Sequence, residues 1–352
     1  ALLLLSFSFS LSAQIPVAAP GETAEVQQRI AGIHKKQQSG QPLSAEDRQF
    51  IQHVNQARMA AWAKEHPPHD SVGLIPLTDL GAGLYKGEQG GLYPGGVNTP
   101  PPAYEKAGLA MAREIVPRDA AGNPAPDGKI VLISCGMSNT TMKFQAFQKL
   151  AAAEGGLNPH LVLVDGAQGG QVARITANPD AHYWIVDDQR LEAAGVTRNQ
   201  VQAAWMEQAN PGPTRPFPAE VKDLQRDILA TLHVMHDRFP NLKIVYLSSR
   251  TYAGYASTPL NPEPHAYETG FAVKWLIADR IAQDGASAPW IAWGPYLWAD
   301  GVKARNDGLS YDRADYGPDG THPSLSGREK VAKLLLHFLK TDPTSRPWFS
   351  AQ

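Results

Sequence analysis

The sequence is poor in the features that indicate a disulfide framework or a nucleic-acid partner. Its 352 residues include one cysteine, Cys135, so an intrachain disulfide and a zinc site built from cysteines are both excluded, and the fold must be held by packing. The 32 basic residues nearly balance the 34 acidic ones, and no dense run of lysine and arginine occurs. This balance provides no attraction for nucleic acid, so we expect a small-molecule or glycan ester as the partner.

Long hydrophobic runs are also missing, apart from the opening stretch "ALLLLSFSFSLSAQ". This stretch is shorter than the roughly 20 apolar residues that a membrane-spanning helix needs. An apolar run that ends in small residues is typical of a secretory signal peptide, here without its basic start. We therefore expect a signal peptide at 1–13, a mature chain from Gln14, a secreted or periplasmic location and no membrane insertion after cleavage. A buried N-terminal strand or helix is the alternative.

The composition is that of a globular protein, with 43% apolar and 19% charged residues. Residues 14–70 are polar and favour helix, and Ser44 is placed to cap a helix through "AEDRQFIQHVNQARMAAWAKEH". We predict a helical N-terminal appendage there. Residues 71–128 are dense in glycine and proline, which predicts a long ordered loop region of a kind that is often functional.

The motif "HPPHD" contains His66, His69 and Asp70, residue types that can bind a metal ion. Its two prolines prevent the helical spacing at which such ligands usually converge. We therefore expect no metal site in this motif.

From residue 129 to residue 345, short apolar runs alternate with amphipathic helices. The runs are "KIVLISC", "HLVLVDG", "VQAAWME", "KIVYLSS" and "PWIAWGPY". This alternation predicts a three-layer α/β/α sandwich with a mainly parallel five-stranded sheet. Ligands bind beyond the carboxyl ends of such strands, so the residues that follow each run are the candidates for chemistry.

The first run is followed by "GMSNTT", which places Ser138 on a turn between a strand and a helix. The first N–H groups of that helix have no partner within it and can stabilise a developing oxyanion. The alternative is ordinary helix capping, for which serine, asparagine and threonine are common.

The second and third runs are followed by "DGAQGG" and "WMEQANPGP". Gly170 in the first segment lets a backbone N–H approach a ligand closely. Gln208 and Asn210 in the second can each supply an amide donor at the same edge of the sheet. Plain turns are the alternative for both segments.

Near the C-terminus, "DGTHPSLSG" carries Asp319 and His322 three residues apart, before the last amphipathic helix. A serine hydroxyl is a weak nucleophile unless a base takes its proton and a third group orients the base. One loop can supply both groups to Ser138. The alternative is a turn in which Asp319 bonds the local backbone.

The order of these segments over residues 129–342 resembles the SGNH (GDSL-type) hydrolase superfamily, and "GMSN" is closer to its carbohydrate-esterase branch than to its lipase branch. The resemblance implies a serine nucleophile, a base with its carboxylate, and oxyanion donors, with no cofactor and no metal. The corresponding residues are Ser138, His322 and Asp319, with Gly170 and Asn210 as the donors and Gln208 as the alternative donor.

Two departures from the family pattern concern the nucleophile turn and the third segment. Met137 stands where the family has an aspartate, and no "GxND" or "QGE" motif follows the third run. The identity of the side-chain oxyanion donor therefore stays open between Asn210 and Gln208.

Three residues are candidates for binding substrate. Arg250 can bind a carboxylate, or else pair with Glu263 or Glu268. Trp298, with its aromatic neighbours, can stack on a sugar or belong to the core. Glu88 lies in the loop region and is expected near the pocket.

The function that the sequence favours is a secreted serine esterase, in particular a carbohydrate O-acetylesterase or deacylase. The alternatives are an aryl, lipid or thioester hydrolase of the same fold and a catalytically inactive glycan-binding module.

Overall fold

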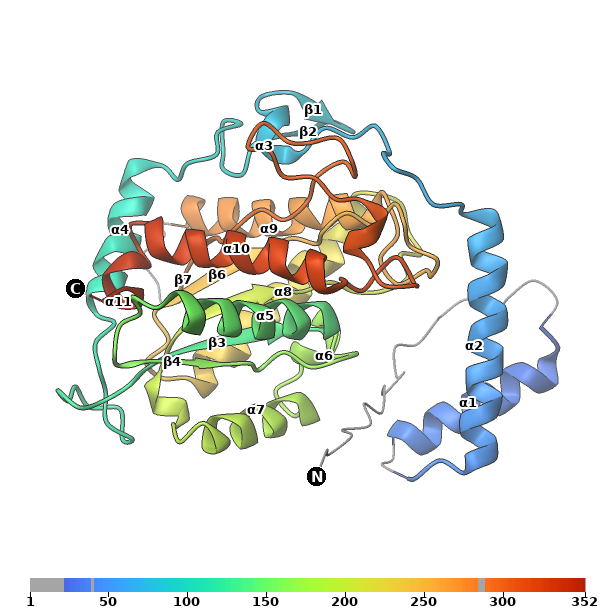
Figure 1. Cartoon of the computed structure of the whole chain (residues 1–352), viewed down its shortest axis with the longest axis horizontal. Helices are drawn as coiled ribbons and strands as arrows, with labels where there is room; N and C mark the ends of the chain where they lie inside the picture. The colour runs from blue at the N-terminus through green and yellow to red at the C-terminus, as the bar shows by residue number, and fades with distance from the viewer. Residues whose placement is uncertain (1–21, 39–40, 284–288, 352) are drawn as a thin grey trace.

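The computed structural model describes residues 22–38, 41–283 and 289–351, so the expected signal peptide lies outside the described residues. Its centre is a five-stranded sheet in which every pair of neighbouring strands is parallel, in the order β4-β3-β5-β6-β7 (Figure 1). The strands are β3 (Ile130–Gly136), β4 (Leu161–Val164), β5 (Val201–Glu207), β6 (Ile244–Ser248) and β7 (Trp290–Trp293).

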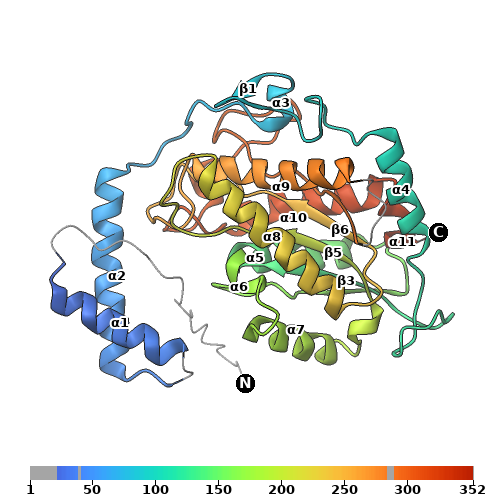
Figure 2. The ribbon, with the colours of Figure 1, turned by 180° about the vertical axis from the view of Figure 1, so that it is seen from behind.

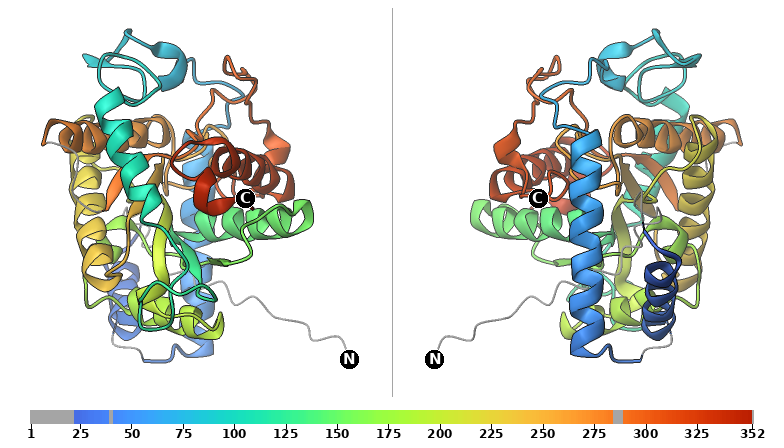
Figure 3. Two further views of the ribbon diagram at one scale, coloured as in Figure 1. Left: turned by 90° about the vertical axis from the view of Figure 1, so that its left-hand side faces the viewer. Right: turned by 90° about the vertical axis from the view of Figure 1, so that its right-hand side faces the viewer.

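Helices cover both faces of the sheet, which makes the three-layer α/β/α sandwich that the sequence predicts. The longest helices of the main body lie in pairs on the two faces, as Figure 2 and the end-on views of Figure 3 show. The first pair is α5 (Ser138–Glu154) and α10 (Leu325–Thr341), and the second is α8 (Ala219–Arg238) and α9 (His265–Ala282). Strands β3, β5 and β6 are buried along their whole length, which explains why they are continuous apolar runs rather than alternating ones.

Smaller elements complete the main body. They are α6 (Ala173–Thr176), α7 (His182–Ala193), η1 (Arg198–Gln200), η2 (Arg313–Asp315) and α11 (Arg346–Phe349). Trp348 and Phe349 of α11 are buried in the main core.

The N-terminal appendage is a pair of helices, α1 (Ala24–Gln38) and α2 (Ala45–Glu65), and Ser44 caps α2 by accepting a hydrogen bond from the Asp47 N–H. Ile30 and Ile33 are buried within this pair but do not belong to the main core. Figure 1 shows α2 standing beside the sheet rather than against one of its faces. The appendage and the main body therefore have separate apolar interiors.

The glycine- and proline-rich region contains more regular structure than its composition predicts. It holds α3 (Leu77–Leu80), β1 (Leu84–Tyr85), β2 (Glu88–Gln89) and the twelve-residue helix α4 (Pro102–Arg113). Proline at the first position of α4 is compatible with a helix, because that N–H has no partner within the helix. The glycine and proline content of the surrounding region predicted a loop, so the sequence did not indicate this helix.

Helix α4 packs closely on β7 at one glycine. A Cβ atom on Gly108 would lie 2.5 Å from the ring of Trp290, so the helix can approach the strand only because Gly108 has no side chain. Gly32 in α1, by contrast, has open space where a Cβ would be.

We predict that Gly108→Ala lowers the free energy of unfolding by about 1–3 kcal/mol, because the added methyl group overpacks this contact. Urea unfolding followed by tryptophan fluorescence measures the change. Gly32→Ala is the matched control, and its unfolding free energy should not fall. Equal stability of Gly108→Ala and the unaltered protein would show that α4 can move away from β7 at little cost.

Candidate active site

Ser138 is the first residue of α5 and follows the end of β3 after a single residue. The turn is tight, since a Cβ on Gly136 would lie 2.3 Å from Thr140 Oγ1 and 2.4 Å from Glu207 O. Thr140 Oγ1 donates to Glu207 O at 2.7 Å and accepts from the Met137 N–H at 3.2 Å. The close contact of Gly136 and the hydrogen bond of Thr140 therefore fix the serine turn against the end of β5.

The structure brings the predicted serine, histidine and aspartate together in one hydrogen-bonded chain. Ser138 Oγ lies 2.8 Å from His322 Nε2, and His322 Nδ1 lies 2.5 Å from Asp319 Oδ2. Asp319 Oδ1 accepts hydrogen bonds from the backbone N–H groups of Thr321 and His322, each at 3.0 Å. The side chains of His322 and Asp319 are about a quarter exposed, so solutes can reach the site.

The charge of the aspartate is stabilised by its partners. Partial burial raises the pKa of Asp319, but the hydrogen bond and charge of His322 and the two backbone N–H groups outweigh burial and hold that pKa below its usual value. The carboxylate is therefore ionised at neutral pH. It orients the imidazole with Nδ1–H towards the carboxylate and Nε2 towards the serine.

Asn139 connects the two parts of the site and was not among the predicted site residues. Its Nδ2 donates to Thr321 O at 2.9 Å, so the residue after the serine holds the loop that carries the histidine. Asn139 is almost fully buried. Its position in "GMSN" was visible in the sequence, but the partner lies 182 residues away.

Two backbone N–H groups are available beside the serine. Those of Ser138 and Gly170 donate to no acceptor among the residues that the structure describes. The glycine loop passes close to the serine, since a Cβ on Gly169 would lie 3.9 Å from Ser138 Cβ. Gly170 has a φ of +77°, which a residue with a side chain rarely adopts. The loop is tied to the serine turn because Gln168 N–H donates to Gly136 O at 3.0 Å.

Both expected side-chain donors form hydrogen bonds with groups outside the serine turn. Asn210 Nδ2 donates to Asp227 Oδ2 at 2.6 Å, and its Oδ1 accepts from the Arg174 N–H at 3.1 Å. Gln208 Nε2 donates to Gln171 O and to Thr176 Oγ1, each at 3.2 Å. These hydrogen bonds hold the loops around the site together, and the oxyanion role of either amide stays a prediction.

Met137, which replaces the aspartate of the family pattern, lies in a small apolar cluster separate from the main core. It is buried with Val172 and Ala209, and Ile175 packs against them. Apolar packing thus supports the serine turn where the family pattern has a carboxylate.

Arg250, expected either to bind a carboxylate or to pair with Glu263 or Glu268, forms an ion pair with a different glutamate. It is only 4% exposed, and its Nη1 lies 2.8 Å from Glu207 Oε1, not beside Glu263 or Glu268. Lys143 Nζ lies 2.6 Å from the same Glu207 oxygen, and both of those side chains are fully buried. Burial lowers the pKa of Lys143 to about 8, although the charge of Glu207 opposes this change. The three charges join α5, β5 and the segment after β6 beneath the serine turn.

We predict that Glu207→Gln lowers the free energy of unfolding by about 3–5 kcal/mol, because it leaves two buried cations without their carboxylate. Urea unfolding at pH 7 measures this loss. Glu329→Gln is the matched control, since Glu329 forms an exposed pair with Lys333 and its loss should cost less than about 1 kcal/mol. Equal effects of the two substitutions would contradict the burial argument.

The other two predicted substrate contacts, Trp298 and Glu88, also form hydrogen bonds within the protein, and for Trp298 the structure agrees with the core alternative. Trp298 is fully buried, and its Nε1 donates to Glu263 Oε1 at 2.7 Å. Glu88 Oε2 accepts a hydrogen bond from Trp275 Nε1 of α9 at 3.1 Å, so its carboxylate joins β2 to that helix. Three aromatic neighbours of Trp298 are buried too, namely Trp290, Trp293 and Tyr296.

Glu263, the partner of Trp298, has an environment that makes stability depend on pH. Burial raises the pKa of Glu263 to about 7, although the N–H groups of Trp298, Ala253 and Tyr267 that donate to its carboxylate oppose this change. A carboxyl group whose pKa is higher in the folded state stabilises the fold fully below its unfolded pKa of 4.5 and loses that contribution as the pH rises towards 7.

We therefore predict that the stability advantage of the unaltered protein over Glu263→Gln shrinks from about pH 5, falls through pH 7 and becomes constant only above about pH 8. Urea unfolding at these pH values gives the difference directly. A difference that does not change with pH would show that Glu263 keeps one charge state throughout.

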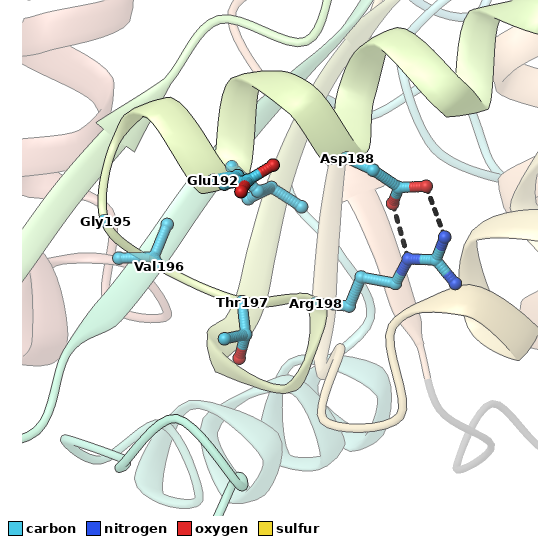
Figure 4. Close-up of a pocket in the computed structure, with 7 residues that line it drawn as sticks. Asp188, Glu192, Gly195, Val196, Thr197 and Arg198 are labelled. Atoms are coloured by element: carbon cyan, nitrogen blue, oxygen red, sulfur yellow. Dashed lines mark hydrogen bonds and ion pairs between the residues drawn. The ribbon is translucent and has the colours of Figure 1, made fainter.

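Two open cavities lie away from the serine. One, of about 410 Å³, lies between the end of α7 and η1 and includes the ion pair of Asp188 with Arg198 (Figure 4). The other, of about 420 Å³, lies on the N-terminal helix pair around Phe50. Neither is lined by Ser138 or His322.

The described part of the chain contains no group of three or more His, Cys, Asp or Glu side chains that could hold a metal ion. Within the same residues, no helix has the length and apolar character needed to cross a membrane.

No protein-family model matches the sequence, and a search of curated proteins found no match. Among solved structures, a carbohydrate esterase family 3 protein from Talaromyces cellulolyticus is 11% identical with a TM-score of 0.36, and the match covers 58% of this chain and 93% of that one. The alpha/beta hydrolase LAE5 from the metagenome of Lake Arreo, Spain, is 15% identical with a TM-score of 0.35, over 63% and 99%. A periplasmic lipopolysaccharide acetyltransferase domain from Salmonella ser. Paratyphi A is 12% identical with a TM-score of 0.36, over 67% and 96%. Likeness at this distance leaves the reaction to be decided from the side chains of the site.

Proposed function

We propose that the protein is a serine esterase that hydrolyses carboxylic esters through an acyl-enzyme, with Ser138 as nucleophile, His322 as base and Asp319 as its orienting carboxylate. The observation that carries this proposal is the continuous chain of hydrogen bonds from Asp319 through His322 to Ser138. A serine whose hydroxyl contacts an imidazole that is itself fixed by a carboxylate is activated for attack on a carbonyl carbon.

In the first half of the reaction, Ser138 Oγ attacks the ester carbonyl carbon and its proton passes to His322 Nε2. Asp319 stabilises the imidazolium that results. The negative charge that develops on the carbonyl oxygen is stabilised by the N–H groups of Ser138 and Gly170, which have no other acceptor among the described residues. The helix dipole of α5 adds to this stabilisation, because its N-terminus is at the serine.

The tetrahedral intermediate formed by this attack collapses as the bond to the alcohol oxygen breaks and His322 gives its proton to that oxygen. The alcohol leaves, and the acyl group remains on Ser138. In the second half, water attacks the acyl carbon while His322 takes a proton from it, and a second tetrahedral intermediate forms. This intermediate collapses, His322 returns the proton to Ser138 Oγ, and the carboxylic acid departs. No cofactor takes part in this sequence.

For the substrate class we propose a carbohydrate O-acyl ester, with acetyl as the acyl group, cleaved by an exported enzyme. Three features support this choice: the "GMSN" form of the serine turn, the lack of a dense basic run that would attract polyanions, and the signal-like sequence at the start of the chain. The partial exposure of His322 and Asp319 suits a substrate that is larger than the ester group itself.

We predict that the purified protein hydrolyses p-nitrophenyl acetate and is labelled by a fluorophosphonate probe. Ser138→Ala and His322→Ala should each lower kcat at least about a thousandfold, and Ser138→Ala should abolish labelling. His337→Ala, which changes an exposed histidine on α10, is the matched control and should leave both unchanged. Release of acetate from acetylated xylan, compared with hydrolysis of a long-chain ester, then tests the substrate class.

A folded protein that neither hydrolyses the ester nor reacts with the probe would contradict the esterase proposal. A binding assay with the same glycan would then test the non-catalytic alternative.

A further inference from the structure

The "HPPHD" motif contacts the loops of the active site, although the proposed reaction does not use it. His69 and Asp70, here called the strap, connect helix α2 to the main body. The His69 N–H donates to Gly254 O at 2.8 Å, and the hydroxyl of Tyr252 donates to His69 O at 2.6 Å. These bonds fasten the strap to the loop that follows β6.

Asp70 is held on two sides. Its backbone O accepts from the Val302 N–H at 2.9 Å and lies so close to Gly301 that a Cβ there would be 1.9 Å away. Its side-chain Oδ1 accepts from the hydroxyl of Tyr255 at 3.0 Å. The carboxylate is thus a fixed acceptor for a tyrosine that is only 4% exposed.

Tyr255 in turn contacts the loop that carries the histidine. Its backbone O lies against Gly320, where a Cβ would be 1.7 Å away, and Gly320 has a φ of +63°. Its ring contacts that of Tyr316 with a centroid distance of 5.6 Å. Two residues further on, the N–H and Oγ of Ser257 both donate to Asp319 O, at 2.9 and 3.1 Å. The loop after β6 therefore supports Asp319 and His322 from behind.

We propose that Asp70 is a positioning residue for the active site: through Tyr255 it holds the loop of Asp319 and His322 in register with Ser138. This inference rests on the proposed esterase function. Asp70 does not touch the reacting atoms, so its effect is on geometry. An error of about 1 Å in the placement of a catalytic group can reduce the rate about a hundredfold, and loss of one supporting hydrogen bond should have part of that effect.

The contacts also distinguish this role from metal binding. His69 uses its backbone for both of its strap hydrogen bonds, and Asp70 Oδ1 is already paired with a hydroxyl. No group of metal-binding side chains includes these residues in the described part of the chain.

The test is a double-mutant cycle on Asp70 and Tyr255 in the full protein. Asp70→Ala and Tyr255→Phe should each lower kcat for p-nitrophenyl acetate about five- to tenfold with KM unchanged, because each removes the same hydrogen bond. The double variant should lose no more than either single variant. Asp70→Asn keeps the side-chain oxygen that accepts from Tyr255 and should restore kcat to within about twofold.

Tyr104→Phe is the matched control. Tyr104 is equally buried, and its hydroxyl donates to Ile291 O in β7 instead of to the strap. Its loss should leave kcat unchanged even where it lowers stability, so an effect through general destabilisation is separated from an effect on positioning.

A second measurement does not depend on turnover. The low-field proton resonance of the His322–Asp319 hydrogen bond, identified by its loss in His322→Gln, should broaden in Asp70→Ala and in Tyr255→Phe, and stay sharp in Asp70→Asn and Tyr104→Phe. Failure of the unaltered protein to hydrolyse or label would overturn the esterase proposal, and this resonance would still decide the positioning role. An unchanged resonance in Asp70→Ala, or multiplied losses of kcat in the double variant, would overturn the inference about Asp70.

Discussion

The hydrogen bond from Asn139 to the carbonyl of Thr321 is the contact on which the geometry of the site most depends. It joins the start of α5 to the loop before α10, two segments 182 residues apart in sequence that are brought together by the packing of these helices on one face of the sheet. Ser138 and His322 are the immediate neighbours of the bonded residues. Helix packing brings the serine and the imidazole near each other. The hydrogen bond from the Asn139 side chain then fixes the two segments, so that Ser138 Oγ and His322 Nε2 lie 2.8 Å apart, a distance that allows proton transfer.

Beneath that contact, the serine turn is held by groups that are costly to bury. Lys143, Glu207 and Arg250 carry three charges into the interior, where a carboxylate shared by two cations offsets only part of the loss of water. The same glutamate offers its backbone oxygen to Thr140, which caps the turn. Stability alone would be served as well by apolar side chains. The arrangement instead fixes one strand, one helix and one loop in a single register next to the nucleophile.

Short-range patterns were sufficient to predict the sheet and to single out Ser138, His322 and Asp319, which the structure brings together, because apolar runs and a three-residue spacing are local properties of the sequence. Side-chain partners from different elements were not predictable in this way. Arg250 pairs with Glu207 on a neighbouring strand, Asn210 with Asp227 on α8, and Trp298 with Glu263. Each of these residues follows a strand as a ligand-binding residue would. Only the three-dimensional neighbours reveal these partners.

The N-terminal helices are linked to the loops of the site by the strap that follows them. They have their own small interior, so their packing contributes little to the main core. Yet the chain leaves α2 and reaches, within a few residues, the bonds of His69 and Asp70 to the loop that supports Asp319. Figures 1 and 3 show α2 on the side of the molecule where the loop after β6 lies. Hydrogen bonds and close backbone contacts therefore link the strap to the histidine loop without a gap, and the positioning role proposed for Asp70 depends on this path.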